Sequence, residues 1–219
     1  MKNNSKFLKY SIPLVLVLLL GNIFLYNFEY KNISYKKVVV PNLASTWAQL
    51  FYSSALVQIG IVNSYDFSNW YYWNWWFPPE NVGVCSDVIR RAFKEINIDF
   101  KNLLDTDIKQ NNDLYNTKFD SNINFRRVKN IDIFLSKNSK KLTNKLIPGD
   151  INNLIEWQAW DIVIFDKMLT SSLWHIGIIS DKRRDDWVPY MLDNHGYWVD
   201  IRITPIDWST KIIGHYRYF

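Results

Sequence analysis

The sequence is poor in the residues that bind metals or form cross-links. It contains one cysteine, Cys85, and three histidines among 219 residues. A single thiol forms no intramolecular disulfide and builds no thiolate zinc site. The histidines, at positions 175, 195 and 215, do not form the H-E-x-x-H motif of zinc hydrolases. We therefore expect neither a metal nor another cofactor.

Glycine and proline are also scarce, at seven residues each, which excludes collagen-like and low-complexity chains. The net charge is only +5, and its basic clusters are short, at 36–37, 126–127, 137–145 and 182–184. A nucleic-acid-binding protein of this size usually carries a larger and more focused positive charge. We expect no nucleic-acid partner, although the charge suits an anionic envelope or membrane surface.

Charged residues are absent from residues 10–28, and Lys2, Lys6 and Lys9 precede this apolar run. A basic start followed by an apolar stretch is typical of export signals, and a helix of this length would extend about 28 Å, enough to span a bilayer core. We predict an uncleaved signal anchor, with a cleaved signal peptide as the second interpretation and a buried N-terminal helix as the third. No cysteine closely follows the run, so a lipoprotein anchor is excluded.

These features divide the chain into residues 1–28 as signal anchor or signal peptide, 29–42 as connector, and 43–219 as a single domain. Hydrophobic residues make up 48% of the chain, enough for one core of that size. The expected location is the cell membrane, with one pass and an extracytoplasmic domain. Signal cleavage would instead give a secreted or periplasmic protein.

Within the domain, the patterns predict helices first and strands afterwards. Apolar residues at helical spacing predict helices over 42–59, 85–96 and 99–115. Runs of β-forming residues predict strands at 161–165, 174–180, 188–192, 197–203 and 212–218. This order predicts an α+β fold in which helices pack on an antiparallel sheet.

Cys85 follows a glycine-containing loop and begins the predicted helix at 85–96. Backbone N–H groups and the helix dipole at such a position stabilise a thiolate, the form of cysteine that attacks substrates. The alternative is a small buried residue that serves packing alone. The position at a helix start makes Cys85 the candidate nucleophile.

His175 begins a predicted strand, and Gly177 leaves space on the same strand face. A helix-borne thiol and a strand-borne imidazole are the two halves of a papain-type site, although a structural histidine is the alternative. A third polar group normally orients the imidazole. The next strand offers Asp193 for this role, with Asn194 as the alternative third residue.

Several stretches occur together in a family-like order: GVCSDVIRRA at 83–92, NINFRRVKN at 122–130, DIV at 161–163, HIGIIS at 175–180, Asn194, Gly196 and GHYR at 214–217. From about residue 55 to the C-terminus, the chain thus resembles the DUF1287 family of exported bacterial proteins, of the NlpC/P60-like, papain-related class. The resemblance implies an NlpC/P60-like papain-type fold with a Cys-His-polar triad. It also implies Cys85 as nucleophile, His175 as base, and the cell wall as substrate.

The sequence departs from the family pattern at four positions. Asn124 and Phe125 stand where the family has Asp-His, Trp160 where it has glycine, and Asp193 where it has histidine. A carboxylate also orients an imidazole and stabilises its charged form, so Asp193 is compatible with a triad. The chain is therefore a divergent active member or one that has lost activity.

Arg126 and Arg127 are candidates for binding a substrate carboxylate, because a guanidinium holds a carboxylate through two hydrogen bonds. A structural salt bridge or a solvated face is the alternative. The aromatic-rich stretch at 66–79 contains Trp76, a candidate for stacking on sugar rings in a substrate groove. Core packing and an interfacial membrane belt are its other interpretations.

The sequence thus predicts an exported or membrane-anchored thiol hydrolase, a cysteine peptidase or amidase that cleaves an amide or peptide bond, with peptidoglycan as the expected substrate. The reaction would pass through an acyl-thioester on Cys85, with His175 moving the proton. Two alternatives remain open. One is a non-catalytic cell-wall-binding module on the same scaffold, and the other is a lipid-amide hydrolase or acyltransferase.

Overall fold

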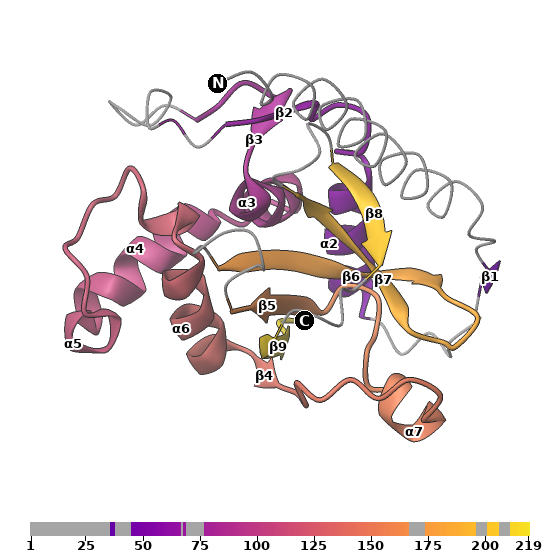
Figure 1. Ribbon diagram of the computed structural model, residues 1–219. Helices are drawn as coiled ribbons and strands as arrows, with labels where there is room; N and C mark the ends of the chain where they lie inside the picture. Colours follow the sequence, from indigo (N-terminus) through magenta and orange to yellow (C-terminus); the bar gives the residue numbers. More distant parts are fainter. Residues whose placement is uncertain are drawn as a thin grey trace, which may run out of the picture. The chain divides into compact units, whose positions relative to one another are not determined.

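An antiparallel sheet formed by the C-terminal half of the chain lies at the centre of the fold (Figure 1). The structure, a computed structural model, describes residues 36–37, 45–66, 68, 77–166, 174–195, 201–205 and 211–219. Within these ranges the strands follow the order β4-β9-β5-β6-β7-β8, and β1 pairs separately with β6. Their bounds are β1 (Lys36–Lys37), β4 (Lys140–Lys141), β5 (Ile162–Phe165), β6 (His175–Arg183), β7 (Pro189–Asn194), β8 (Ile201–Pro205) and β9 (Ile212–Arg217). The predicted α+β class and the five predicted strands are confirmed, with β5 to β9 as their counterparts.

Alternate residues of the central strands enter two different apolar clusters. On β5, Ile162 and Ile164 join the larger cluster, which also contains residues of α3, whereas Val163 and Phe165 join a smaller cluster around Trp157. Successive side chains of a strand point to opposite faces. A strand with a core on each side therefore needs an unbroken apolar run, and the Ile-Val-Ile-Phe sequence of β5 provides one.

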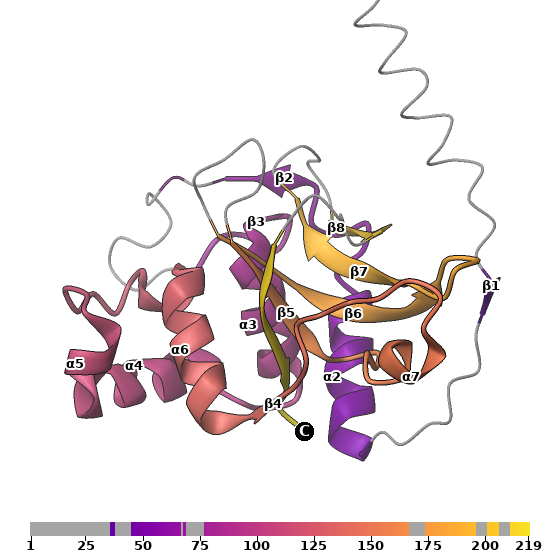
Figure 2. The ribbon, with the colours of Figure 1, turned by 60° about the horizontal axis from the view of Figure 1, so that its bottom comes forward.

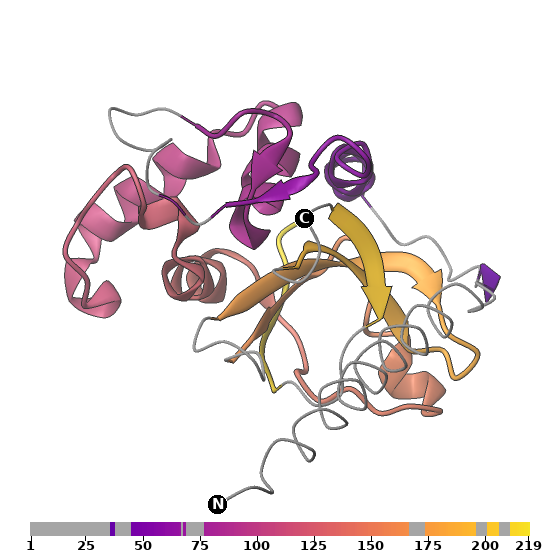
Figure 3. The same ribbon diagram turned by 45° about the horizontal axis from the view of Figure 1, so that its top comes forward.

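Helix α3 (Cys85–Glu95) lies against β6 and β7, and α2 (Thr46–Leu56) packs on α3 (Figure 2, Figure 3). The rings of Phe51 and Phe93 join the two helices, with centroids 4.8 Å apart. Eight of the eleven residues of α3 are buried, including its whole first turn. The N-terminus of this helix, where Cys85 lies, is therefore part of the interior.

The remaining helices lie between α3 and β5 in the sequence. The predicted helix over 99–115 is wrong at Asn111, where the chain forms two helices, α4 (Phe100–Gln110) and α5 (Asn112–Tyr115). The Asn111 amide donates to the carbonyl oxygen of Asp107 (3.0 Å), so a side chain competes for a helix acceptor. A 3-10 turn, η2 (Asn124–Arg126), leads into α6 (Val128–Asn138), which packs against β9, and α7 (Ile151–Leu154) precedes β5.

The N-terminal predictions fall mostly outside the described residues. The signal anchor predicted at 1–28 lies there, as does most of the connector, although β1 at 36–37 pairs with β6. Residues 36–219 form one compact unit. Among the residues that the structure describes, no helix is long and apolar enough to cross a membrane.

Candidate functional site

Cys85 is the first residue of α3, and its side chain is buried. The turn before it is closely packed, because a Cβ on Gly83 would lie 3.0 Å from Nη1 of Arg91 and 3.2 Å from Cβ of Asp87. The backbone N–H of Val84 donates to Oδ2 of Asp87 (2.9 Å), which closes the first turn of the helix. This packing fixes the thiol at the helix N-terminus, where the helix dipole favours negative charge.

His175 contacts both other members of the candidate triad. Its Nε2 lies 2.5 Å from Oδ2 of Asp193, which is fully buried on β7. The ring is also close enough to the side chain of Cys85 for a hydrogen bond between them to raise the pKa of the imidazole. Because Asp193 occupies Nε2, Nδ1 is the ring nitrogen left for the sulfur. The structure therefore brings Cys85, His175 and Asp193 together in the order nucleophile, imidazole, carboxylate.

The charge state of His175 follows from these neighbours. Burial by itself lowers the pKa of the imidazole, because it disfavours the charged ring. The negative charge of Cys85 and the hydrogen bond that the ring donates to Asp193 outweigh burial and raise the pKa of His175 to about 10. At neutral pH the ring is then mostly an imidazolium, the form that would favour a thiolate on Cys85.

Gly177 is needed for Asp193 to reach the imidazole. A Cβ at position 177 would lie 2.5 Å from Sδ of Met191 and 3.2 Å from Cβ of Asp193. These two β7 side chains occupy the space that the glycine leaves on this face of β6. The strand pairing thus carries Asp193 to the same face as His175, as the alternation of strand side chains requires.

Tyr65 is a site residue that the sequence patterns do not reveal. It lies on β2 (Ser64–Tyr65), which pairs in parallel with β3 (Val82–Gly83), so Tyr65 is opposite Gly83. Its hydroxyl contacts both the backbone and the side chain of Cys85. Burial, followed by the charge of Cys85, raises the pKa of Tyr65, so the hydroxyl keeps its proton and can donate a hydrogen bond.

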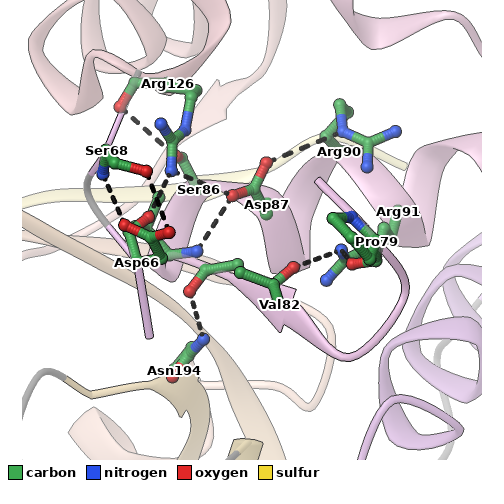
Figure 4. Close-up of polar contacts among 12 residues, drawn as sticks. Asp66, Ser68, Pro79, Val82, Ser86, Asp87, Arg90, Arg91, Arg126 and Asn194 are labelled. Carbon is green, nitrogen blue, oxygen red and sulfur yellow. Dashed lines mark hydrogen bonds and ion pairs between the residues drawn. The ribbon is translucent and has the colours of Figure 1, made fainter. Parts of the chain in front are cut away.

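Asn194, the alternative third residue, has a different position from Asp193. Its Nδ2 donates to the carbonyl oxygen of Gly83 (2.9 Å), two residues before the thiol (Figure 4). Adjacent strand residues point to opposite faces, so one can contact the imidazole while the other contacts the loop before α3. The structure therefore gives Asn194 a place beside the nucleophile loop and gives Asp193 the contact with His175.

The two candidate carboxylate-binding arginines have partners inside the chain. Nη2 of Arg126 donates to the backbone oxygen of Asp66 (2.9 Å) and lies 3.5 Å from Oδ2 of Asp87, as Figure 4 shows. Nη1 of Arg127 donates to Oγ1 of Thr117 (2.9 Å) and to the carbonyl oxygen of Lys118 (3.1 Å). These contacts match the structural alternative for both residues, and their role in substrate binding stays a prediction. Trp76 lies outside the described residues.

Three of the positions that depart from the family pattern have structural roles. Phe125 is buried and meets the ring of Phe77 edge-on, with centroids 5.7 Å apart. The buried amide of Asn124 donates to Oδ1 of Asp105 (3.2 Å). Trp160 has a φ of +83°, a left-handed conformation that glycine adopts without strain and other residues do not. A glycine at this position of the family is explained by that backbone.

A second histidine–carboxylate pair lies on strand β9 and the residue before β5. Nε2 of His215 is 3.0 Å from Oδ2 of Asp161, and the ring stacks on Trp157 with centroids 4.0 Å apart. Arg217 donates to both oxygens of the same carboxylate, from Nε (2.7 Å) and Nη2 (2.8 Å). In the part of the chain that the structure describes, no three His, Cys, Asp or Glu side chains are grouped so that they could hold a metal ion.

Comparison with known proteins gives the family of this chain. Residues 52–218 match the family described as Domain of unknown function (DUF1287). The chain is also 34% identical over 146 residues to the uncharacterized protein YijF of Escherichia coli (strain K12). The match covers 64% of this chain and 66% of YijF, so the chain spans slightly less than two thirds of that relative, and no solved structure matches. Because the family match extends over well more than half of its length, the chain belongs to the DUF1287 family.

Proposed function

We propose that this DUF1287 protein is a cysteine peptidase or amidase in which Cys85 is the nucleophile, His175 the base and Asp193 the group that orients the imidazole. The observation that carries the proposal is the double contact of His175, which is hydrogen-bonded to the Cys85 side chain and lies 2.5 Å from Asp193. A buried thiol at a helix N-terminus, packed on an antiparallel sheet that supplies the other two groups, is also how an NlpC/P60-like, papain-type fold arranges its triad.

The reaction begins from the thiolate–imidazolium pair. The thiolate adds to the carbonyl carbon of an amide, and the electron pair of the C=O bond moves to the oxygen. His175 gives its proton to the leaving nitrogen as the C–N bond breaks, which leaves an acyl-thioester on Cys85. The now neutral His175 takes a proton from water as the oxygen of water attacks the thioester. Departure of the thiolate releases the acid and restores the ion pair.

The negative oxygen of the tetrahedral intermediate needs hydrogen-bond donors near Sγ. Two groups that contact each other beside the thiol could supply them, the backbone N–H of Cys85 and the hydroxyl of Tyr65. The raised pKa of Tyr65 supports a donating role, because the hydroxyl stays protonated throughout the pH range of the reaction. Tyr65 is held on β2 and Cys85 at the first position of α3, so both donors belong to regular structure.

Peptidoglycan is the proposed substrate, and the apolar run at 10–28 is proposed to hold the enzyme in the cell membrane with its domain outside the cytoplasm. The resemblance to cell-wall peptidases supports the substrate, and the lysines before an uncharged run support the location. The stem peptides of peptidoglycan offer amide bonds and carboxylates within reach of the cell surface.

Digestion of purified peptidoglycan tests the proposal. The full chain in detergent is incubated with peptidoglycan, and soluble products are identified by mass spectrometry. Cys85→Ala and His175→Ala should each lower the rate by at least about 1,000-fold, and Asp193→Asn by about 100-fold or more. Asp186→Asn, in a partly exposed ion pair with Arg184, serves as the matched control and should leave the rate unchanged.

Other outcomes would support the alternatives. Product formation that survives Cys85→Ala would reject the thiol mechanism. Binding of peptidoglycan without products, unchanged after alkylation of Cys85, would instead indicate a wall-binding module. Cleavage of lipid amides in place of peptidoglycan would indicate the lipid-amide hydrolase.

A further inference from the structure

Helix α2 buries one side in the domain and exposes large apolar side chains on its other side, among uncharged polar residues. Ala48, Phe51, Tyr52 and Ala55 are buried on the inner face. The outer side of the helix and the turn after it carry five large apolar residues that are substantially exposed: Trp47 (53%), Leu50 (48%), Val57 (61%), Ile59 (39%) and Ile61 (49%). We refer to these five residues as the α2 face. A group of exposed large apolar side chains is normally covered, by protein or by lipid.

The sequence around the α2 face contains no charge. Residues 38–65 include no Asp, Glu, Lys or Arg, although charged residues make up 21% of the chain. Apart from Phe77, the exposed large apolar residues elsewhere lie within two positions of a charged residue; Leu114, for example, directly follows Asp113. Single exposed apolar residues are ordinary on protein surfaces, whereas a group of five in an uncharged stretch indicates an interaction surface.

We propose that the α2 face docks on the surface of a lipid bilayer. The inference rests on the part of the proposed function that places residues 10–28 in the membrane. Only residues 29–35 separate that run from β1, and seven residues extend at most about 25 Å. The point at which the domain joins its anchor is therefore held close to the bilayer.

Helix α2 is attached to the strand that the junction joins. Strand β1 pairs with β6 at Lys182 and Arg183. Immediately before these residues, Oδ1 of Asp181 accepts a hydrogen bond from the hydroxyl of Tyr52 on α2 (2.8 Å). The short tether therefore ends beside the β6 residue to which α2 is attached, which makes the bilayer an apolar partner held near this helix.

The charges of this region suit a bilayer with anionic lipids. Between the apolar run and Asp66, the sequence contains one acidic residue, Glu29, and three lysines, at positions 31, 36 and 37. Juxtamembrane lysines are attracted by anionic headgroups, and the absence of carboxylates from 38–65 removes the repulsion. Tryptophan is favoured at the headgroup level, and Trp47 lies at the start of the helix. Docking would hold the domain in one orientation on its anchor.

A fluorescent probe at position 50 tests the docking. The full chain with Cys85→Ala, which removes the native thiol, receives Leu50→Cys or, as the matched control, Leu114→Cys. Each variant is labelled at its new cysteine with an environment-sensitive dye and is incorporated into vesicles of phosphatidylcholine and phosphatidylglycerol. The dye at position 50 should emit at shorter wavelength than the dye at position 114, and brominated lipids should quench it alone. Circular dichroism checks that both variants are folded.

Three results would overturn the inference, and each has a separate meaning. Equal emission at positions 50 and 114, in a chain that still floats with the vesicles, would reject docking and leave the anchor intact. A blue-shifted dye at position 50 that brominated lipid does not quench would show that protein, such as a second copy, covers the α2 face. A chain that does not float would reject the anchor itself. The chemistry is tested independently by the peptidoglycan digestion.

Discussion

Removal of the Cys85 thiol should make the imidazole of His175 lose its proton at a lower pH. Burial is the largest single influence on this ring, and it lowers the pKa. The charge of Cys85 is the first of the influences that raise the pKa, ahead of the hydrogen bond with Asp193. In the Cys85→Ala chain, Asp193 alone opposes burial, so the pKa must fall from its value of about 10.

The structure sets the size of the expected change. With a pKa of about 10, about 1% of the His175 rings are neutral at pH 8. Each whole-number fall of the pKa multiplies that fraction by about ten. We expect the Cys85→Ala chain to show at least a tenfold increase, to about 10% or more of neutral ring at pH 8. A Cys85→Ser chain, which keeps a polar group without an equal charge, should resemble Cys85→Ala.

Nitrogen NMR of the histidine-labelled full chain in detergent micelles measures the titration directly. The chain has three histidines, and a His175→Gln variant identifies the signal of interest. His215, which is paired with Asp161, provides an internal control that Cys85→Ala should not alter. Titration of His175 near pH 6.5 in the wild type would refute the ion pair, and so would an identical titration after removal of the thiol.

The raised pKa of His175 also predicts that the stability of the fold depends on pH. The pKa of His175 is raised in the folded state above the ordinary value of 6.5. Its protonation therefore stabilises the fold fully below pH 6.5, and this contribution is lost as the pH rises through about 10. Urea denaturation at pH 6, 8 and 10 should show a decline in the wild type that is smaller in Cys85→Ala.

Three further changes test the packing around the site. Asp161→Asn should destabilise the fold by about 3–5 kcal/mol, since it leaves the buried His215 and the partly buried Arg217 without their carboxylate. Asp186→Asn, in a partly exposed pair, should cost less than about 1 kcal/mol. Equal losses in urea denaturation would contradict the burial argument. Gly177→Ala should cost about 1–3 kcal/mol because its Cβ would meet Met191, and the double variant with Met191→Ala should lose less stability than the two single losses added together. Trp160→Gly should be at least as stable as Trp160→Ala in thermal unfolding, because the backbone at this position has a positive φ. At ordinary positions alanine is instead more stable than glycine by ~0.4–1 kcal/mol. A more stable Trp160→Ala variant would show that this backbone is not strained.

The elements that carry the candidate site could be predicted because each has a strong local pattern. The helix start at Cys85 follows from the glycine loop and from apolar residues at helical spacing, and the strand at His175 follows from a run of β-branched residues. The alternation of strand side chains also distinguishes Asp193 from Asn194 once the two strands pair. These are short-range features, which a single sequence expresses well.

The other contacts could not be predicted, because they join segments without a pattern of their own. Tyr65 reaches Cys85 through a pair of two-residue strands, too short to show any periodicity. His215 meets Asp161 across the pairing of β5 with β9, and nothing local in either segment specifies the other. At Trp160 the sequence shows only a difference from a family glycine, whereas the positive φ shows why glycine suits the position.

Strand β7 fixes the positions of two parts of the candidate site that come from distant segments of the chain. Asp193 contacts the imidazole on one face of the strand, and Asn194 binds the carbonyl oxygen of Gly83, before the thiol, on the other. A shift of β7 by one residue would exchange these faces, so that both contacts would be lost together. The position of the imidazole and that of the nucleophile loop are thus set by one strand register. This coupling gives a reason for adjacent polar residues at 193 and 194, both fully buried, where a strand would otherwise carry apolar side chains.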